Sequence, residues 1–374
     1  MAARGGIVGS SILCSFRLQG KGGRCVQRSR WRRLRVLLPA LGVAGLGLAG
    51  CSSAPASVLD PAGPVAKDEL NLITFSFWIM MFVLAAVFIL LGMALWKAHR
   101  QKQREGLPPQ TEGNNRLEIT WTVIPVIIVI ALMVPSISTT FRVGVVPAQA
   151  KDFQVTVIGH QYWWEFQYPG EGIVTADELH IPVGQEVDLE ITSTDVMHSF
   201  WVPRLGGKVE ALPGHVNQLW LKADKTGVYP GQCAQFCGTG HADMAFKVVV
   251  DTPQQYQQWV ASMKQTAATP VSAQAQQGKQ LFQQNCQSCH AINGVSQGAQ
   301  IPVYGTEYKG SMGPNLTNFG LHTGIAGDTL SNTPANLAQW IADPQAVKPG
   351  ATMPRLGLNQ SQINAVAAYL EGLK

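Results

Sequence analysis

The stretch Cys233-Ala-Gln-Phe-Cys237-Gly-Thr-Gly-His241-Ala-Asp-Met244 decides the fold of the middle of this chain, because it gathers four metal-ligating side chains into 12 residues. The C-x3-C-x3-H spacing could place its ligands on one helical face, but Pro230 and the nearby glycines favour a loop. Thiolate and imidazole alone would suit zinc. The added thioether shifts the choice toward copper, whose thiolate sites often carry a weak axial Met. We therefore predict a copper-binding loop, with a structural zinc site or chance cysteines beside a core Met as the alternative.

The sequence around this loop has the pattern of β-strands. Short runs rich in β-branched residues, separated by Gly and Pro, lie at residues 153–158, 186–191, 216–221 and 246–250. They predict a β-sandwich or barrel of about 110 residues. A further imidazole, His198, follows Val196-Met197 in a strand-end motif 35 residues before Cys233.

A second motif, Cys286-Gln-Ser-Cys289-His290, has the C-x-x-C-H spacing of covalent c-type haem attachment, in which two thiols form thioethers and the His binds iron. The second iron ligand must come from downstream, where Met312, His322 and Met353 are available. A segment rich in Ala, Gln, Thr and Ser, residues 263–275, precedes the motif and predicts a flexible linker.

The composition indicates a membrane anchor. Only 14% of the residues are charged, and uncharged runs at 70–96 and 119–141 are each long enough to cross a bilayer as a helix. These runs predict a transmembrane helical hairpin at 70–141. A purely soluble protein is thereby excluded, and two spans with long polar flanks argue against a many-helix transporter.

The distribution of charge sets the topology. The first 50 residues hold nine Lys and Arg and no acid, whereas residues 51–374 hold 19 bases and 23 acids, a net charge of −4, so nucleic-acid binding has no support. Five Lys and Arg lie at 97–118, between the spans, and the positive-inside rule puts them in the cytoplasm. The segment 51–69 and everything after 141 then lie outside. Glu118 lies at the cytoplasmic start of the second span, where a helix N-terminus favours a carboxylate.

The N-terminus predicts a leader. Arginines at 28–35 precede an apolar stretch at 36–50 that is too short for a span and is typical of a signal peptide. Small residues directly before Cys51 resemble a bacterial lipoprotein cleavage site. We expect residues 1–50 to be removed and Cys51 to carry lipid; a Cys beside an ordinary cleavage site is the alternative.

Residues 70–262 resemble cytochrome c oxidase subunit II. The resemblance rests on Leu117-Glu-Ile-Thr-Trp121-Thr-Val-Ile-Pro125, on Gly159-His-Gln-Tyr-Trp-Trp164, on Asp195-Val-Met-His198 and on the complete loop at 233–244. It implies a two-helix hairpin followed by a Greek-key cupredoxin domain, residues 142–262, that holds the dinuclear copper A centre. The implied ligands are two bridging thiolates, two imidazoles, a thioether and a backbone carbonyl, from Cys233, Cys237, His198, His241, Met244 and Gln235.

The same resemblance implies further roles and two departures. Many members have Glu at position 235, whose side chain helps bind magnesium, and many have at position 162 a Trp that receives electrons. Here Tyr162, Trp163 and Trp164 are the electron-relay candidates, with packing as the plain alternative. The residue matching Glu118 lies at the mouth of a proton pathway in the family, so Glu118 is a candidate for proton uptake.

The C-terminal region, residues 276–374, resembles a small all-α class I cytochrome c. The resemblance includes Gly313-Pro-Asn-Leu316 and a Met353-Pro354 pair before a final helix expected at 360–373. It implies that Cys286 and Cys289 bind haem c covalently and that His290 and Met353 are the axial ligands. A Met–His pair would raise the haem potential. Another helix is expected to start near Thr333-Pro334.

These resemblances imply subunit II of a respiratory haem–copper oxidase with a fused cytochrome c. Electrons would pass from haem c to copper A and on to subunit I, where oxygen is reduced, so the chain is an enzyme only as part of that complex. The implied partners are subunits I and III, an external cytochrome c or other donor, and membrane lipid. The implied location is the bacterial inner membrane, with copper and haem on the outer side. The alternative is a membrane-tethered copper–haem electron carrier serving a different terminal reductase. A quinol oxidase subunit would lack Cys233 and Cys237, and a copper chaperone would not explain the haem motif.

Overall fold

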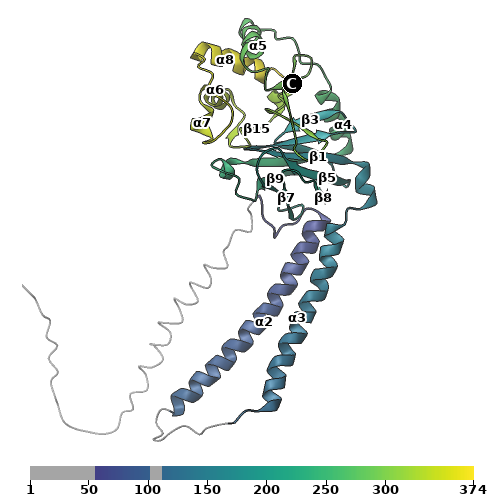
Figure 1. Ribbon diagram of the computed structural model, residues 1–374, viewed down its shortest axis with the longest axis vertical. Helices are drawn as coiled ribbons and strands as arrows, with labels where there is room; N and C mark the ends of the chain where they lie inside the picture. The colour runs from purple at the N-terminus through teal and green to yellow at the C-terminus, as the bar shows by residue number, and fades with distance from the viewer. Residues whose placement is uncertain (1–54, 102–111) are drawn as a thin grey trace, which may run out of the picture. The chain divides into compact units, whose positions relative to one another are not determined.

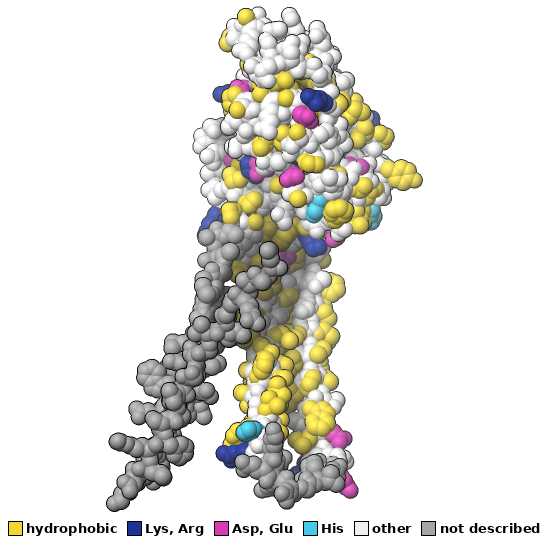
Figure 2. All heavy atoms as spheres, turned by 90° about the vertical axis from the view of Figure 1, so that its left-hand side faces the viewer, with side chains coloured by type: hydrophobic (Ala, Val, Ile, Leu, Met, Phe, Trp, Pro, Cys, Tyr) yellow, Lys and Arg dark blue, Asp and Glu magenta, His cyan; other side chains and the backbone are white. Residues whose placement is uncertain are grey.

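A computed structural model describes residues 55–101 and 112–374 of the chain, so the predicted leader, the predicted lipid attachment at Cys51 and most of the loop between the two spans lie outside the described residues. Two long helices come first, α2 (Pro64–Gln101) and α3 (Asn115–Gly144). They run side by side (Figure 1). Both are long and apolar enough to cross a membrane, with mean hydropathies of 2.7 and 2.4 in their most apolar windows, and hydrophobic side chains cover their surfaces (Figure 2). The predicted hairpin is confirmed, and its helices extend a few residues beyond the uncharged runs.

The second helix continues through two prolines. Pro125 and Pro135 lie inside α3, and the Ser136 hydroxyl donates a hydrogen bond to the carbonyl of Leu132 at 2.7 Å, one turn away. This is a back-bond to the carbonyl four residues earlier, which pairs the Ser hydroxyl inside an apolar helix. At the start of α3, the side chain of Asn114 caps the helix by accepting from the backbone N–H groups of Arg116 and Leu117.

The domain after the helices is a sandwich of two five-stranded sheets (Figure 1). One sheet has the order β3-β2-β1-β5-β8 and the other β4-β10-β9-β6-β7. The strands are β1 (Gln154–His160), β2 (Trp163–Tyr168), β3 (Ile173–Ala176), β4 (Glu178–Pro182), β5 (Glu186–Ser193), β6 (His198–Trp201), β7 (Lys208–Ala211), β8 (Asn217–Lys222), β9 (Gly227–Cys233) and β10 (Ala245–Asp251). A short 3-10 helix, η1 (Ala148–Asp152), connects α3 to the sandwich. The β-sandwich and four of its strands were predicted.

Aromatic rings fill the space between the sheets. Trp164 packs edge-on against Phe200 and Phe246, and those two phenylalanine rings stack with their centroids 4.5 Å apart. Helix α4 (Pro253–Met263), which a Thr252–Gln255 capping box begins, buries Met263 in the same core. The sandwich core therefore includes the helix that leads to the next domain.

The C-terminal domain is built on four helices: α5 (Ala273–Asn285), α6 (Pro334–Ala342), α7 (Pro344–Val347) and α8 (Gln360–Glu371). Helices α5 and α8 cross closely at Gly278, where a Cβ atom would lie 1.9 Å from the carbonyl oxygen of Ala365. Between α5 and α6 lie three two-stranded ladders, β11 (Ala291–Ile292) with β12 (Ser296–Gln297), β13 (Gln300–Pro302) with β14 (Lys309–Ser311), and β15 (Gly324–Ile325) with β16 (Leu330–Ser331), and the 3-10 helix η3 (Phe319–Leu321). The predicted all-α class holds for the core of this domain, and the predicted helices at 334 and 360 are confirmed.

The linker is held in place, which differs from the flexible coil that its composition predicts. The backbone N–H of Ala267 donates to the carbonyl of Asn293 at 3.0 Å, and the Asn293 side chain donates to the carbonyl of Met263 at 2.6 Å. Lys264 forms an ion pair with Glu171 at 2.6 Å. The partners lie far away in the chain, so composition alone could not reveal them.

Candidate metal and haem sites

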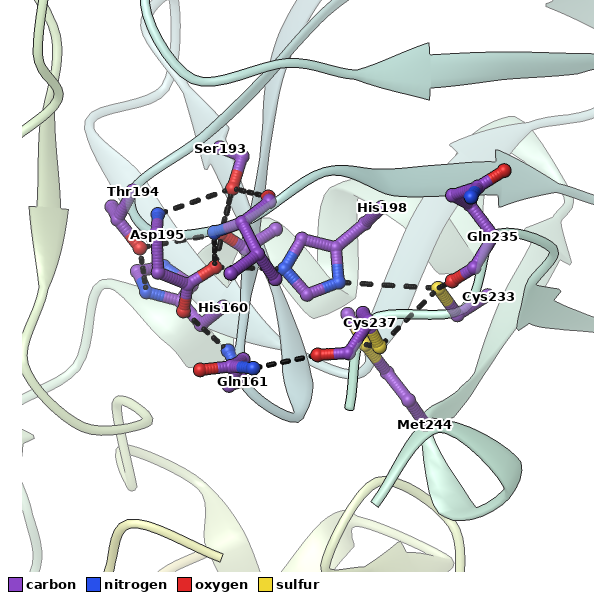
Figure 3. Close-up of polar contacts among 12 residues, drawn as sticks. His160, Gln161, Ser193, Thr194, Asp195, His198, Cys233, Gln235, Cys237 and Met244 are labelled. Atoms are coloured by element: carbon purple, nitrogen blue, oxygen red, sulfur yellow. Dashed lines mark hydrogen bonds and ion pairs between the residues drawn. The ribbon is translucent and has the colours of Figure 1, made fainter. Parts of the chain in front are cut away.

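The six predicted copper ligands converge at one end of the sandwich. Strand β9 ends at Cys233, β6 begins at His198, and the chain returns through η2 (His241–Asp243) to β10. The two thiol sulfurs of Cys233 and Cys237 lie 3.9 Å apart. Figure 3 shows the side chains of His198, both cysteines and Met244 directed toward one another. The loop form that glycines and Pro230 predict is confirmed.

Each remaining donor atom lies against one of the two sulfurs. The Nδ1 atom of His198 is 3.9 Å, and the carbonyl oxygen of Gln235 3.2 Å, from the Cys233 sulfur. The Nδ1 atom of His241 and the Met244 sulfur are 3.6 and 3.8 Å from the Cys237 sulfur. Three sulfurs, two imidazole nitrogens and one carbonyl suit a soft thiophilic metal such as copper. Two thiolates between two imidazoles fit a pair of metal ions better than one.

Asp195 orients His198, a role that sequence reasoning missed although it quoted the Asp195-Val-Met-His198 motif. Its Oδ1 atom lies 2.8 Å from Nε2 of His198, which leaves Nδ1 directed at Cys233 (Figure 3). Burial alone would lower the pKa of His198, but the hydrogen bonds with Asp195 and Cys233 outweigh it and raise the pKa. A carboxylate on the second ring nitrogen fixes the tautomer of a metal-binding His.

The contact between the two thiols shifts their pKa values in opposite directions. The hydrogen bond with Cys237 lowers the pKa of Cys233 below its ordinary value, although burial opposes the shift. The same contact raises the pKa of Cys237 above its ordinary value, with burial in support. Thiols bind metals as thiolates, so a bound metal would displace their protons.

The C-x-x-C-H motif lines an apolar cavity of about 300 Å³. The Nδ1 atom of His290 lies 2.8 Å from the carbonyl oxygen of Pro314, so it donates there and leaves Nε2 free for a metal. Burial lowers the pKa of His290, which keeps the ring neutral, as an iron ligand must be. Cys286 and Cys289 line the same cavity with Met353, so these residues fit a covalently held haem.

The three predicted candidates for the second iron ligand have different surroundings. Met353 lines the cavity and is half-buried. Met312 is 49% exposed, and its sulfur lies 3.5 Å from that of Cys289, a haem-attachment residue. His322 has its Nδ1 atom 3.9 Å from the Glu178 carboxylate. All three residues line the cavity, so the preference for Met353 rests on its Met-Pro context before the final helix and stays a prediction.

The three relay candidates occupy different places. Tyr162 lies over the copper loop, where a Cβ atom on Gly240 would be 2.5 Å from its ring. Trp163 stacks on His160 with centroids 4.2 Å apart, and both Tyr162 and Trp163 line the haem cavity. Trp164 is fully buried, and its ring centroid lies 5.9 Å from that of His198. Tyr162 therefore lies between the two sites, whereas Trp164 belongs to the core beside a copper ligand.

One wall of the haem cavity comes from the copper-binding domain. Gln161 lines the cavity, and its Nε2 atom donates to the carbonyl of Cys237 at 2.6 Å (Figure 3). A single side chain thus contacts both the cavity and the backbone of a predicted copper ligand. Sequence reasoning quoted Gln161 within a motif but assigned it no role.

Glu118 lies in the first turn of α3, far along the chain from both sites. Its backbone carbonyl accepts a hydrogen bond from the Thr122 hydroxyl at 2.9 Å, and the side chain is exposed. The position fits a helix-end carboxylate, and its predicted role in proton uptake stays a prediction.

Comparisons with known proteins match each part of the chain. The family profile of the transmembrane domain of cytochrome c oxidase subunit II matches residues 53–139, and that of its periplasmic domain matches residues 172–252. The cytochrome c profile matches residues 275–374. A membrane-anchored sandwich with a thiolate–imidazole cluster, joined to a C-x-x-C-H domain, defines a redox subunit of the haem–copper oxidase class.

Similar proteins place the chain within that class. Cytochrome c oxidase subunit 2 of Alkalihalophilus pseudofirmus is 38% identical over 92% of this chain and 98% of its own length. The protein of the same name from Bacillus subtilis is 36% identical, with the same shares covered. The chain belongs to the cytochrome c oxidase subunit II family and carries a fused cytochrome c domain. It is a membrane-anchored subunit of an oxidoreductase complex with an extracellular domain, and the family implies partnership with subunit I and suggests copper and haem as cofactors.

Two further likenesses complete the comparison. Quinol oxidase subunit 2 of Bacillus cereus is 39% identical over 65% of this chain and 83% of its own length. Among solved structures, the periplasmic domain of cytochrome oxidase subunit II of Bradyrhizobium japonicum is 30% identical over 32% of this chain and 97% of that chain, with a TM-score of 0.31.

Proposed function

We propose that this chain receives electrons at a covalent haem c and passes them through a dinuclear copper A centre to subunit I, where oxygen is reduced to water. The observation that carries the proposal is the shared wall between the two sites: Gln161 and Tyr162 line the haem cavity and contact the copper loop. When bound, the copper pair and the haem supply reversible one-electron chemistry.

The protein's part in this function is to hold its donor atoms still. Cys233 and Cys237 come from a strand end and a loop, and His198 from a second strand, so the ligand set is tied to two neighbouring strands of one sheet, β9 and β6. Asp195 holds His198, and Pro314 holds His290, each through the ring nitrogen that faces away from the site. A site whose ligands are fixed in advance needs little rearrangement when its charge changes, which favours electron transfer over substrate turnover.

The finer assignments follow from the same proposal. The copper ligands are His198, Cys233, the Gln235 carbonyl, Cys237, His241 and Met244, and the haem ligands are Cys286, Cys289, His290 and Met353. Tyr162 and Trp163 are relays on the cavity wall. The chain sits in the bacterial inner membrane, receives electrons from an external cytochrome c or another donor, and packs on subunits I and III and lipid.

Two other functions share part of this evidence. A membrane-tethered copper–haem carrier would serve another terminal reductase, and the quinol oxidase relative raises quinol as the donor. The ligand cluster and the haem motif both favour a one-electron protein donor, because each provides a metal centre that a two-electron quinol donor does not need.

The test is purification of the tagged chain from its membrane in mild detergent. We expect a multi-helix haem-bearing subunit in equal amount, a mixed-valence copper signal, and oxygen uptake driven by reduced cytochrome c. A Cys233→Ser variant should lose the copper signal and keep haem c. Recovery of the chain alone, or with a different reductase, would support the carrier, and oxygen uptake driven only by quinol would overturn the proposed route.

A further inference from the structure

Lys348 is a buried lysine that crosses from the haem domain to the copper domain. It follows α7 and is 2% exposed. Its Nζ atom donates to the carbonyl of Tyr162 at 2.6 Å and to the carbonyl of Ala326 at 2.8 Å. Lys348 also lines the haem cavity, together with Tyr162. A fully buried ammonium is costly unless it is paired, so this arrangement calls for a reason.

The loop around the ammonium is shaped to receive it. Ala326, Gly327 and Asp328 all have positive φ angles, of 58°, 70° and 60°, a conformation that Ala and Asp adopt rarely. A Cβ atom on Gly327 would lie 2.5 Å from Nζ of Lys348. A three-residue left-handed run persists only where its surroundings over-determine it, and here the carbonyl of Ala326 is one of the two acceptors for the lysine.

The same loop binds the copper domain on its other side. The N–H of Ala245 donates to the carbonyl of Gly327 at 3.2 Å, and Lys247 pairs with Asp328 at 2.6 Å. The Thr329 hydroxyl, which donates to the carbonyl of Ala326 at 2.7 Å, lies 3.3 Å from the carbonyl oxygen of Asp243, in the 3-10 helix that carries His241. The contact therefore reaches the copper loop from two directions, through Tyr162 and through residues 243–247.

Negative groups of the copper domain face the lysine. Burial lowers the pKa of Lys348 to about 8, while the charges of Asp177 and Asp243 oppose the shift. Burial raises the pKa of Asp177 to about 7, and the charge of Lys348 is the largest influence that opposes this shift. The Asp177 carboxylate also accepts from the N–H of Trp164 at 2.9 Å.

We propose that Lys348 is a positioning residue for electron transfer, which holds the haem domain on the backbone of Tyr162 and places a positive charge between the haem cavity and the copper loop. This inference rests on the proposed haem-to-copper route. It goes beyond that route by giving Lys348 two roles. Its hydrogen bonds hold the haem domain against the copper domain, and its charge favours the reduced form of the haem.

Removing the ammonium has two separate consequences. Two carbonyls lose a charged donor, and since hydrogen bonds to charged groups are the stronger kind, the docked population relative to the undocked one should fall roughly tenfold to hundredfold. The loss of a positive charge beside the haem cavity should also lower the haem reduction potential, because less positive surroundings stabilise the added electron less.

The experiment uses the complete oxidase with Lys348→Met, Lys348→Arg and, as a matched loss of one surface charge, Lys374→Met. Three readouts are taken: hydrogen exchange of the Ala245 amide, which docking protects, the haem midpoint potential, and the rate of haem-to-copper transfer after flash reduction. We expect Lys348→Met to speed Ala245 exchange about tenfold or more, to lower the potential and to slow transfer. Lys348→Arg should keep the potential, and Lys374→Met should change none of the three.

The readouts separate the inference from the function beneath it. If the unaltered protein passes no electrons from haem to copper, the proposed route fails, while the exchange of Ala245 still tests docking by Lys348. If Lys348→Met leaves both Ala245 exchange and the haem potential unchanged, the role of Lys348 is overturned. Should Lys348→Met fail to assemble, Lys348→Gln, which keeps a donor without the charge, must lower the potential or the inference falls.

Discussion

His290 shows how one backbone contact prepares a residue for a ligand role. The carbonyl of Pro314 takes the Nδ1 proton at 2.8 Å, and burial keeps the ring neutral, so Nε2 faces the cavity as an acceptor. The motif alone identifies His290 from sequence. The three candidates for the second iron ligand, Met312, His322 and Met353, all line the cavity, so the fold alone does not single out one of them.

Met353 should be that ligand, and Met312 should not. Met353→Ala should open an iron position, lower the haem potential and allow reduced protein to bind carbon monoxide, because the thioether favours ferrous iron. Met312→Ala removes a side chain of the same kind, which is 49% exposed and contacts Cys289, so it serves as the matched control. Carbon monoxide binding by Met312→Ala alone would show that the ligand is misassigned.

The predicted role of Glu118 in proton uptake can be tested by substitution. If this exposed carboxylate collects protons for subunit I, Glu118→Ala should reduce proton uptake and turnover while leaving haem-to-copper transfer unchanged. Glu112→Ala, a neighbouring carboxylate just before the helix, is the control. Equal proton uptake in Glu118→Ala and in the unaltered enzyme would leave Glu118 only its helix-end role.

At the scale of elements, the two longest strands that sequence reasoning missed lack alternation. Strand β2 is buried at five of its six positions, and β9 contains Pro230 and two glycines. Strand β10 alternates between buried and half-buried positions and was predicted, whereas β4 alternates too but has only five residues and was missed. The same holds for the sites: local motifs identified the ligands at 233–244 and 286–290, while Lys348 and Asp177 gained their surroundings only through contacts between distant segments.

Glu178 at the start of β4 joins the two domains through histidines, and acid should weaken that junction. Its carboxylate accepts from the N–H of Thr323 at 3.2 Å, and the ring nitrogens of His180 and His322 lie 4.0 and 3.9 Å away. Burial would raise the pKa of Glu178, but the neighbouring rings of His180 and His322 and the N–H of Thr323 lower it to about 2. A lowered pKa stabilises the fold above the unfolded value near 4.5, and this contribution is lost as the pH falls toward 2.

The contribution of Glu178 should be on the order of 3 kcal/mol at neutral pH. Glu178→Gln should therefore lower the unfolding free energy of the extramembrane region at pH 7 and flatten its pH dependence between about 4.5 and 2, measured by denaturant titration across that range. Glu307→Gln, at an exposed position of the haem domain, should keep the slope. A Glu178→Gln curve parallel to that of the unaltered protein would contradict the assignment.

At the scale of the whole molecule, the C-terminal domain is held on the sandwich by direct contacts as well as by the connecting chain. Residues 139–262 carry seven Lys and Arg and 13 Asp and Glu, a net charge of −6, and residues 263–374 carry six and four, a net charge of +2. Beyond this favourable sign, specific contacts join the domains: Ser311 donates its N–H to Glu165 at 2.7 Å, and the Tyr308 hydroxyl bonds to Glu190. Screening by salt should therefore slow an external basic donor more than the internal step, whose buried contacts salt reaches less.

Separating the two domains should make transfer to copper depend on concentration. Met263 is buried in the sandwich core, so the cut belongs after Gln265, and residues 266–374 are then supplied as a separate haem protein. A short tether gives an effective concentration on the order of millimolar, so a micromolar supply should slow transfer by as much as about a thousandfold. Flash reduction at rising concentrations of the separate domain measures this. Because the haem domain covers Tyr162 and Trp163 in the intact chain, the truncated complex should also expose them to direct donors. If it accepts electrons from external cytochrome c as fast as the intact enzyme does, then haem c is not the obligatory port, and these two aromatic residues form the electron-accepting surface instead.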